Sequence, residues 1–485
     1  MKIVIIGAGL GGLECGYLLS KQGFEVCILE QGAQIGGCLQ SFVRKGHHFD
    51  TGFHYVGGMG EGEILYRLFE EFNLLNLPWK ELDKDGFDEI FIDGERYVYR
   101  NGYKEFADEL AKQFPAQHKE LQRYADVLKK AQEGLQDFSK MADNPLSREL
   151  MATSAYSFLQ QNFSDEKLRN VLSATSLKMD LQAESLPFYL FAQINGTFIQ
   201  SAWRLVGGGQ VIADSLAAGI RSFGGEVRTK ARVTGIQVEN ERVCGITING
   251  EEEIACDLVV SDIHPNMLFP LLPEGALRKR YIQRIHNLHN SFGVFTVHLL
   301  LKENSVKYRN RNLFVHHQPE LWRTAEQPID GRTRSIGVHF SVPTDGGEYT
   351  RNIDLFMPMY WQEVSEWADS RPMRRPDDYE TFKQRRAEDA IQQVIPYLPE
   401  LKGNIEQVFT STPLTYRDYT GTYEGSAYGI CKDCNNLMVT MLPTKTPLPN
   451  LFMTGQSINF HGVMGVTVTA KITCEQIMAT LPTLA

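Results

Sequence analysis

The amino-acid sequence predicts an α/β protein in which a parallel-sheet domain is interrupted by an inserted α+β domain. Three observations support this fold class. An apolar, β-branched run from Ile3 to Ile6 leads into a glycine turn and a helix, as a strand buried on both faces would. Residues 61–204 mostly show helical spacing of apolar residues, and a last strand, Leu451 to Thr454, precedes a helix without charge until Lys471.

The first forty residues have the order strand, glycine turn, helix and strand. Gly7 permits the tight exit from the first strand, Gly9 lets the backbone approach a pyrophosphate, and Gly12 lets the helix pack closely on the sheet. The helix begins at Leu10, and its N-terminus directs unpaired N–H groups toward a phosphate. Glu30 lies at the tip of the second strand, 23 residues beyond Gly7, where a carboxylate can accept both ribose hydroxyls. This pattern predicts a Rossmann-like dinucleotide-binding domain.

A second glycine pair, Gly36-Gly37, follows Glu30 in EQGAQIGGCLQSF. The combination resembles the extended fingerprint of flavoproteins of the amine oxidase and phytoene desaturase superfamily, which implies FAD as the cofactor. Those proteins usually carry Arg directly after the pair, whereas this sequence has Cys38. The resemblance implies cofactor contacts from Gly7, Gly9, Leu10, Gly11, Gly12, Glu30, Gln31, Gly36, Gly37 and Cys38.

Residues 44–60 leave the first domain as a charged and glycine-rich loop that contains FDTG and then HYVG. These motifs resemble retinol saturase and its bacterial relatives within the carotenoid desaturase and isomerase family. The resemblance implies that this loop returns to the flavin edge and lines the reacting end of a substrate channel. It makes His54 and Tyr55 candidate catalytic residues, either of which could donate a proton.

The segment from 61 to 204 is expected to form a substrate domain. Glu89 to Ile92 and Arg96 to Tyr99 flank Asp93-Gly94, which predicts a hairpin. Ser185 to Trp203 carries no charge, but its proline, glycine and amides argue against a membrane span and favour a buried helix. A wall of an apolar cavity, or a surface that dips into lipid, is the alternative.

The GGGQ sequence at Gly207 begins a return to the first domain. A helix from Val211 to Phe223 is followed by strand, strand, hairpin and strand up to Ser261. In the resembling family, Val233 sits where the backbone pairs with adenine.

The C-terminal motif contains TGQSINFHGVMG. The resemblance places Gly455 and Gln456 at the ribitol or pyrophosphate, with Gln456 as in the retinol saturase branch, and places Gly465 and Val466 at the flavin C2 carbonyl. It also places His461 as a catalytic candidate and Tyr428, from a TPLTY-to-AYG stretch, at the substrate. No metal ligand is assigned, because Cys431 and Cys434 have no second cysteine pair nearby and are expected to be reduced thiols.

Two discontinuous domains follow from this order of segments. Residues 1–60, 205–290 and 440–485 are expected to form the FAD-binding domain. Residues 61–204 and 291–439 are expected to form the substrate domain, with a sheet from the second excursion covering the flavin.

The net charge of −10 and pI near 5.7 argue against nucleic acid as a partner. Because the chain opens on a core strand, no signal peptide and a cytoplasmic location are expected, with peripheral membrane contact left open.

The sequence thus predicts an FAD-dependent oxidoreductase that exchanges hydride with a conjugated, apolar polyene or isoprenoid, by saturation, desaturation or isomerisation. The electron donor or acceptor is not identified, since a second glycine-rich nucleotide motif is absent. Two alternatives remain. One is a flavin amine oxidase, which shares the fingerprint, and the other is a non-enzymatic isoprenoid-binding protein similar to the Rab escort and dissociation-inhibitor proteins.

Overall fold

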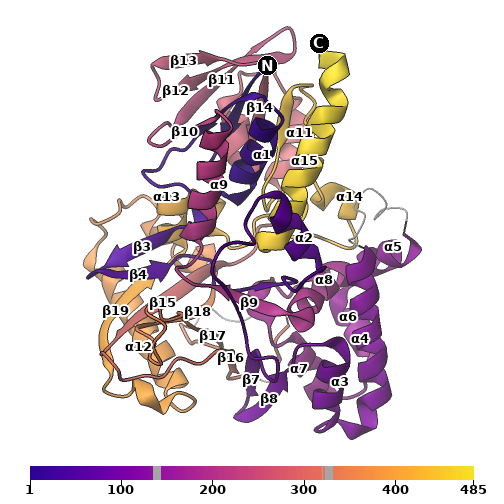
Figure 1. The fold of residues 1–485 in the computed structure, drawn as a ribbon, viewed down its shortest axis with the longest axis vertical. Coiled ribbons are helices and arrows are strands. Elements are labelled where there is room, and N and C mark those ends of the chain that lie inside the picture. Colours follow the sequence, from indigo (N-terminus) through magenta and orange to yellow (C-terminus); the bar gives the residue numbers. More distant parts are fainter. Residues whose placement is uncertain (135–143, 319, 323–330, 485) are drawn as a thin grey trace.

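The computed structural model describes residues 1–134, 144–318, 320–322 and 331–484. Within these residues the largest sheets are a five-stranded parallel sheet and a seven-stranded mixed sheet. Figure 1 shows both chain ends at the top of the view beside the parallel sheet, a helical cluster at the lower right, and the mixed sheet below and to the left. The fold is therefore the α/β arrangement with an inserted α+β part that the sequence predicts.

The parallel sheet has the order β10-β2-β1-β14-β20, and all neighbouring strands run parallel. Its strands are β1 (Lys2–Ile6), β2 (Glu25–Leu29), β10 (Glu226–Arg228), β14 (Leu258–Ser261) and β20 (Leu451–Met453). β1 lies at the centre, where Ile5 is opposite Ile28 on one side and Val260 on the other. Three segments that are far apart in the sequence thus meet in one sheet.

Both faces of β1 are buried, which explains its uninterrupted apolar sequence. Ile3 and Ile5 share a core with the helices α1 (Leu10–Lys21), α9 (Gln210–Ser222) and α15 (Gly462–Leu484). Val4 and Ile6 point to the opposite face. There they share a core with the antiparallel sheet of β11 (Val233–Glu239), β12 (Arg242–Ile248) and β13 (Glu252–Ala255). The predicted helix and strand order of residues 211–261 is confirmed.

The short helices on this second face are α10 (Pro265–Leu268) and α11 (Lys279–His286).

The mixed sheet has the order β19-β15-β18-β17-β16-β7-β8. Its strands are β7 (Asp88–Ile92), β8 (Glu95–Tyr99), β15 (Gly293–Leu301), β16 (Asn312–His316), β17 (Ser335–Phe340), β18 (Asn352–Met359) and β19 (Ile405–Ser411). The hairpin at Asp93-Gly94 is confirmed by the pairing of β7 with β8. β7 also pairs in parallel with β16, so the two excursions of the chain share one sheet.

One face of the mixed sheet packs against the charged helix α12 (Asp377–Val394), as Val297, Leu355 and Ala390 share a core. The alternate residues of the same strands, such as His298, point to the other face. That second face is the one turned toward the cavities described below.

The helical cluster consists of α3 (Tyr103–Ala111), α4 (His118–Glu133), α5 (Pro145–Ala152), α6 (Ala155–Asn162), α7 (Glu166–Ser173) and α8 (Phe188–Gln200), whereas α2 (Ile64–Glu71) lies beside α15. α8 is the uncharged stretch of the sequence, and most of its residues are buried, as expected. Among the described residues, no helix is both long enough and apolar enough to cross a membrane.

The loop expected at residues 44–60 contains more regular structure than predicted. β3 (Ser41–Arg44) and β4 (His47–Asp50) form a hairpin whose turn uses Lys45 and Gly46 at positive φ. β5 (Val56–Gly57) then pairs with β9 (Ala202–Leu205), which also pairs with β6 (Trp79–Glu81). The charged residues that suggested a loop lie on the exposed side of the hairpin.

Candidate functional site

A pocket of about 310 Å³ opens at the carboxyl edge of the parallel sheet, beside the glycine turn and the start of α15. This edge is where open α/β sheets bind their ligands. Of the predicted cofactor residues, those that line it are Gly7, Gly9, Leu10, Gly11, Glu30, Gln31, Gly36, Gly37, Cys38, Val233, Gly455, Gln456 and Val466. Residues from the first, middle and last segments of the sequence therefore surround one space.

Gly12 and Gly465 lie behind the pocket rather than on its wall. A Cβ on Gly12 would collide with the carbonyl oxygen of Gly7, so this glycine lets α1 pack closely on the turn. A Cβ on Gly465 would lie 2.7 Å from the Phe460 backbone. Both glycines shape the pocket through packing.

The glycine turn packs against a buried carboxylate. The Asp262 carboxylate lies where side chains on Gly9 and Gly11 would be, 2.5 Å and 2.6 Å from their ideal Cβ positions. Burial raises the pKa of Asp262 to about 7, while hydrogen bonds from the backbone N–H groups of Gly12 and Gly9 act in the opposite direction. Side chains at Gly9 and Gly11 would therefore collide with Asp262, which explains the glycines. The N-terminus of α1 at Leu10 lies at the pocket wall, where helix N–H groups can bind a diphosphate.

Glu30 is held by the same turn. Its Oε2 accepts a hydrogen bond of 3.0 Å from Ala8 N–H, and its Oε1 accepts one of 2.6 Å from Gly32 N–H. The carboxylate is fixed at the tip of β2 beside the pocket. Opposite it, Gly462, Val463 and Val466 bring the N-terminus of α15 to the pocket wall, where the positive end of a helix favours negative charge.

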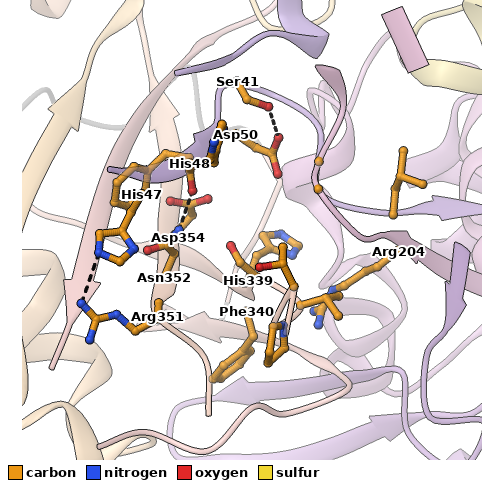
Figure 2. A pocket seen from close by; sticks show the side chains of 18 of the residues that line it. Ser41, His47, His48, Asp50, Arg204, His339, Phe340, Arg351, Asn352 and Asp354 are labelled. Carbon is orange, nitrogen blue, oxygen red and sulfur yellow. Dashed lines mark hydrogen bonds between the residues drawn. The ribbon is translucent and has the colours of Figure 1, made fainter. Parts of the chain in front are cut away.

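A second cavity of about 310 Å³ lies between the β3–β4 hairpin, β9 and the ends of β17 and β18. Figure 2 shows Asp50, Arg204, His339 and Asp354 around it. Phe53 lines both this cavity and the cofactor pocket, so the FDTGFHY loop separates the two spaces. His54 lines the second cavity, and its predicted place in a substrate channel remains a prediction.

The second cavity is more polar than the apolar slot that the sequence led us to expect. Asp50 Oδ1 accepts hydrogen bonds from Ser41 Oγ at 2.9 Å and from Gly209 N–H at 3.1 Å. Burial raises the pKa of Asp50 to about 7. Its carboxyl group is therefore close to half protonated at neutral pH.

His54 stacks on His339 with ring centroids 4.4 Å apart and nearly parallel planes. Burial lowers the pKa of His54 to about 4, and it lowers the pKa of His339 well below its ordinary value. Both imidazoles are neutral at pH 7. His54 therefore cannot serve as a protonated acid there, although it can accept a hydrogen bond.

Beneath this pair, a buried polar network links the helical cluster to the mixed sheet. Asp88 accepts hydrogen bonds from Lys178 Nζ at 3.1 Å, Tyr55 Oη at 2.9 Å and Asn312 Nδ2 at 2.7 Å. Asn312 Oδ1 in turn accepts from Arg204 and is 2.7 Å from His339 Nδ1. Burial raises the pKa of Tyr55 well above its ordinary value, and the negative charge of Asp88 raises it further. Tyr55 is therefore a poor proton donor.

His461 and Tyr428 form a separate group, and both line a small cavity of about 20 Å³. Their ring centroids lie 4.6 Å apart. His461 Nε2 lies 3.1 Å from the Lys178 carbonyl, and Tyr428 Oη donates to the carbonyl of Leu177. Burial lowers the pKa of His461 to about 4, and Tyr428 lines the cofactor pocket. Of the four residues predicted for catalysis or substrate, His54 thus lines the second cavity and Tyr428 the cofactor pocket, whereas Tyr55 and His461 line neither of these two spaces.

Sequence reasoning missed Asp50, Arg204, Asp262 and His339. Asp50 belongs to the FDTG motif that was recognised, so its position beside the predicted loop could have drawn attention to it. Arg204, Asp262 and His339 stand in strands or just after one without a motif of their own. Their roles depend on pairings between distant segments.

The fold and the pocket define an FAD-dependent oxidoreductase. The comparisons agree: the chain belongs to the family of flavin containing amine oxidoreductases, whose model matches residues 10–478. In this family the FAD would be held by the glycine turn, Glu30 and the α15 N-terminus.

The chain is similar to the human all-trans-retinol 13,14-reductase, with 26% identity over 99% of this chain and 85% of the relative. It is also similar to a 4,4′-diapophytoene desaturase of Methylomonas, with 25% identity over 61% of this chain and 60% of the relative. Among solved structures, a triple mutant of putrescine oxidase aligns with a TM-score of 0.67 and 17% identity, over 99% of this chain and 98% of the other. That last likeness concerns the fold.

Proposed function

We propose that this protein exchanges hydride between FAD and a conjugated, mainly apolar polyene or isoprenoid, by saturation, desaturation or isomerisation. The observation that carries the proposal is the shared wall at Phe53, where the cofactor pocket adjoins a cavity built from the FDTGFHY loop. The names of the relatives, a retinol reductase and a carotenoid desaturase, support a polyene substrate. The partners implied are an apolar small molecule and an electron donor or acceptor of unknown identity.

The polar residues that line the second cavity indicate which kind of substrate it could accept. Asp50, Arg204 and the two stacked imidazoles would be poor neighbours for a pure hydrocarbon, because polar groups lose solvation when an apolar chain covers them. We propose that this cavity receives a polar end of an otherwise apolar substrate, and that the carbon to be reduced or oxidised lies at the Phe53 side.

When bound, FAD supplies a hydride donor or acceptor at its N5 atom. The chain's own residues must place the reacting carbon, exclude water and handle a proton. We assign proton transfer to Asp50, since its pKa of about 7 suits a general acid near neutral pH. His54, Tyr55 and His461 remain proposed site residues, with positioning roles: His54 stacks on His339, and His461 packs against Tyr428.

The test is anaerobic reduction of the FAD-loaded protein, followed by rapid mixing with all-trans-retinol and with carotenes. Reoxidation of the flavin together with loss of polyene absorption is the expected result for a saturase, and bleaching of the oxidised protein by substrate is expected for a desaturase. Reduction by amines without any response to polyenes would favour the amine oxidase alternative. A purified protein that does not retain FAD would favour the lipid-binding alternative.

Variants test the site within this experiment. His54→Ala and His461→Ala should slow the polyene step at least about tenfold while FAD content stays unchanged. His118→Ala is the matched control, because His118 lies exposed on α4 and contacts Asp108. Rates equal to the control in both variants would remove these histidines from the site.

A further inference from the structure

Asp180, His289 and Cys431 bring three different metal-binding groups together outside the cofactor pocket. One ligand atom from each lies within 4.8 Å of the others. The three residues come from the end of the helical cluster, from the segment before β15 and from the loop after Tyr428. Nothing in the proposed oxidoreductase chemistry uses them.

The backbone explains why His289 and Cys431 lie together. Asn290 and Ile430 form an antiparallel bridge, and Cys431 N–H donates a 2.9 Å hydrogen bond to the His289 carbonyl. On the other side of the bridge, Ser291 N–H donates to the Gly429 carbonyl at 2.9 Å. The two side chains are thus presented by two segments joined through an isolated antiparallel bridge, which fixes their proximity.

Asp180 supplies the second, independent observation. The residue is 7% exposed, and its Oδ1 is buried without a hydrogen-bond partner among the described residues. Its Oδ2 accepts weak hydrogen bonds from Gln182 Nε2 at 3.3 Å and Phe292 N–H at 3.4 Å, and lies 4.0 Å from Cys431 Sγ. A buried carboxylate oxygen without a donor is costly unless a cation or a proton satisfies it.

A small cavity adjoins two of the three residues. A cavity of about 20 Å³ is lined by both Asp180 and Cys431, and a volume of this size holds roughly one water molecule. His289 is exposed and closes the group from the solvent side. Glu424 interacts electrostatically with His289. The buried Lys432 lines the same cavity and adds positive charge beside Cys431. However, its Nζ donates hydrogen bonds to the carbonyls of Thr440, Ser457 and Ile458.

We propose that Asp180, His289 and Cys431 bind one Zn²⁺ ion, with water as the fourth ligand. Zinc takes sulfur, imidazole nitrogen and carboxylate oxygen together in tetrahedral geometry, at about 2.0–2.3 Å. Such bond lengths place the ligand atoms roughly 3.3–3.7 Å apart. The side chains therefore need to approach one another by about 1 Å, while the Cys431 thiol gives its proton to solvent.

The ion would fix the wall of the flavin site. Tyr428 precedes Cys431 by three residues, and the carbonyls of Leu177 and Lys178 that hold Tyr428 and His461 lie just before Asp180. Zinc would join these two segments to the 289–291 strand. Its role is positioning, since none of its ligands lines the cofactor pocket.

The test is metal binding by the tag-free, FAD-loaded protein. After dialysis against Zn²⁺ and then against a weak chelator, elemental analysis should find about one zinc per chain. X-ray absorption at the zinc edge should show one sulfur neighbour at about 2.3 Å, with the rest nitrogen or oxygen.

Variants identify the ligands. Cys431→Ser and His289→Ala should each weaken zinc binding by about tenfold or more. Cys434→Ser and His286→Ala are matched controls and should retain the zinc: Cys434 Sγ donates to the Glu184 carbonyl, and His286 is exposed at the end of α11. His289 is exposed, so His289→Ala should not disturb folding. This variant therefore tests the site without any change at the buried Asp180.

Zinc content no higher in the wild type than in Cys431→Ser would overturn the proposal. So would equal loss in Cys434→Ser, which would place the ion on the C-x-x-C pair instead. Because metal content and FAD content are measured separately, failure of this proposal leaves the oxidoreductase function intact, and the reverse also holds.

Discussion

Glu30 accepts one hydrogen bond through each of its carboxylate oxygens, from Ala8 N–H and from Gly32 N–H. The acid at the end of β2 therefore holds the turn through both of its oxygens, beside the ribose contact that we propose for it. Glutamine has one carbonyl oxygen, so it can replace only one of these acceptors.

Glu30→Gln should therefore weaken FAD binding at least about tenfold, or about 1.4 kcal/mol. The measurement is the dissociation constant of FAD from quenching of flavin fluorescence on reconstitution. Glu25→Gln is the control, because Glu25 lies exposed at the start of β2. Equal affinities for the wild type and Glu30→Gln would contradict the role of Glu30 at the cofactor.

Asp50 gives the proposed reaction a pH dependence whose direction follows from burial. Because burial raises the pKa to about 7, the carboxyl group is protonated below pH 7 and ionised above it. The rate of reoxidation of reduced flavin by a polyene should fall as pH rises through about 7. Asp50→Asn should abolish this limb and lower the rate by about two orders of magnitude.

Asp345→Asn serves as the control for Asp50, since Asp345 is exposed at the mouth of the same cavity. A wild-type pH profile that persists in Asp50→Asn would assign the proton to another group. Stopped-flow absorbance between pH 5.5 and about 9 resolves these outcomes.

At the level of elements, the junction between β9 and α9 couples the cavity to the parallel-sheet region. Gly208 has φ near +79°, and a Cβ there would overlap the Asp50 carboxylate. The next residue, Gly209, donates its N–H to Asp50 at 3.1 Å. The GGGQ sequence thus allows the start of α9 to approach the β3–β4 hairpin.

Gly208→Ala should lower the free energy of unfolding by about 2–4 kcal/mol, because alanine is strained at positive φ and must also displace Asp50. Gly224→Ala measures the backbone strain alone, because Gly224 has φ near +87° with no atom within 4 Å of its Cβ position. A loss of roughly 1–2 kcal/mol in the free energy of unfolding is expected for this variant. Denaturant unfolding of the FAD-saturated proteins measures the difference. Equal losses in the two variants would show that contact with Asp50 is unimportant.

Elements with local signals were predictable from the sequence. The β1–α1–β2 unit, the β7–β8 hairpin and the β20–α15 ending each have a periodicity or a turn that their own residues define. The parallel pairing of β7 with β16 has no local signal, and neither does the approach of His339 to His54. For the same reason the cofactor pocket was largely foreseen, whereas Asp50, Arg204 and His339 were not. The domain boundaries remain predictions.

At the scale of the whole molecule, the cofactor pocket joins segments from both ends of the chain. Its wall includes residues near Gly9, Val233 and Gly455, so FAD bound there would contact three segments that separate on unfolding. A ligand that binds only the folded state stabilises it in proportion to the logarithm of its concentration.

Addition of FAD to 100 times its dissociation constant should stabilise the apoprotein by about 2.7 kcal/mol, with a matching rise in Tm. The same addition to Glu30→Gln, at the same absolute FAD concentration, should give a smaller rise. Differential scanning fluorimetry at a wavelength free of flavin emission is the measurement. A Tm that does not respond to FAD in the wild type would contradict the pocket assignment.

The position of α15 and β20 beside β1 also has a consequence during biosynthesis. A nascent polypeptide that has emerged only as far as residue 450 possesses the glycine turn but lacks Gly455, Gln456 and the start of α15. The chain can therefore bind FAD stably only after Val466 has been synthesised. A chain whose synthesis stalls before that point would carry an incomplete FAD site and would release the cofactor.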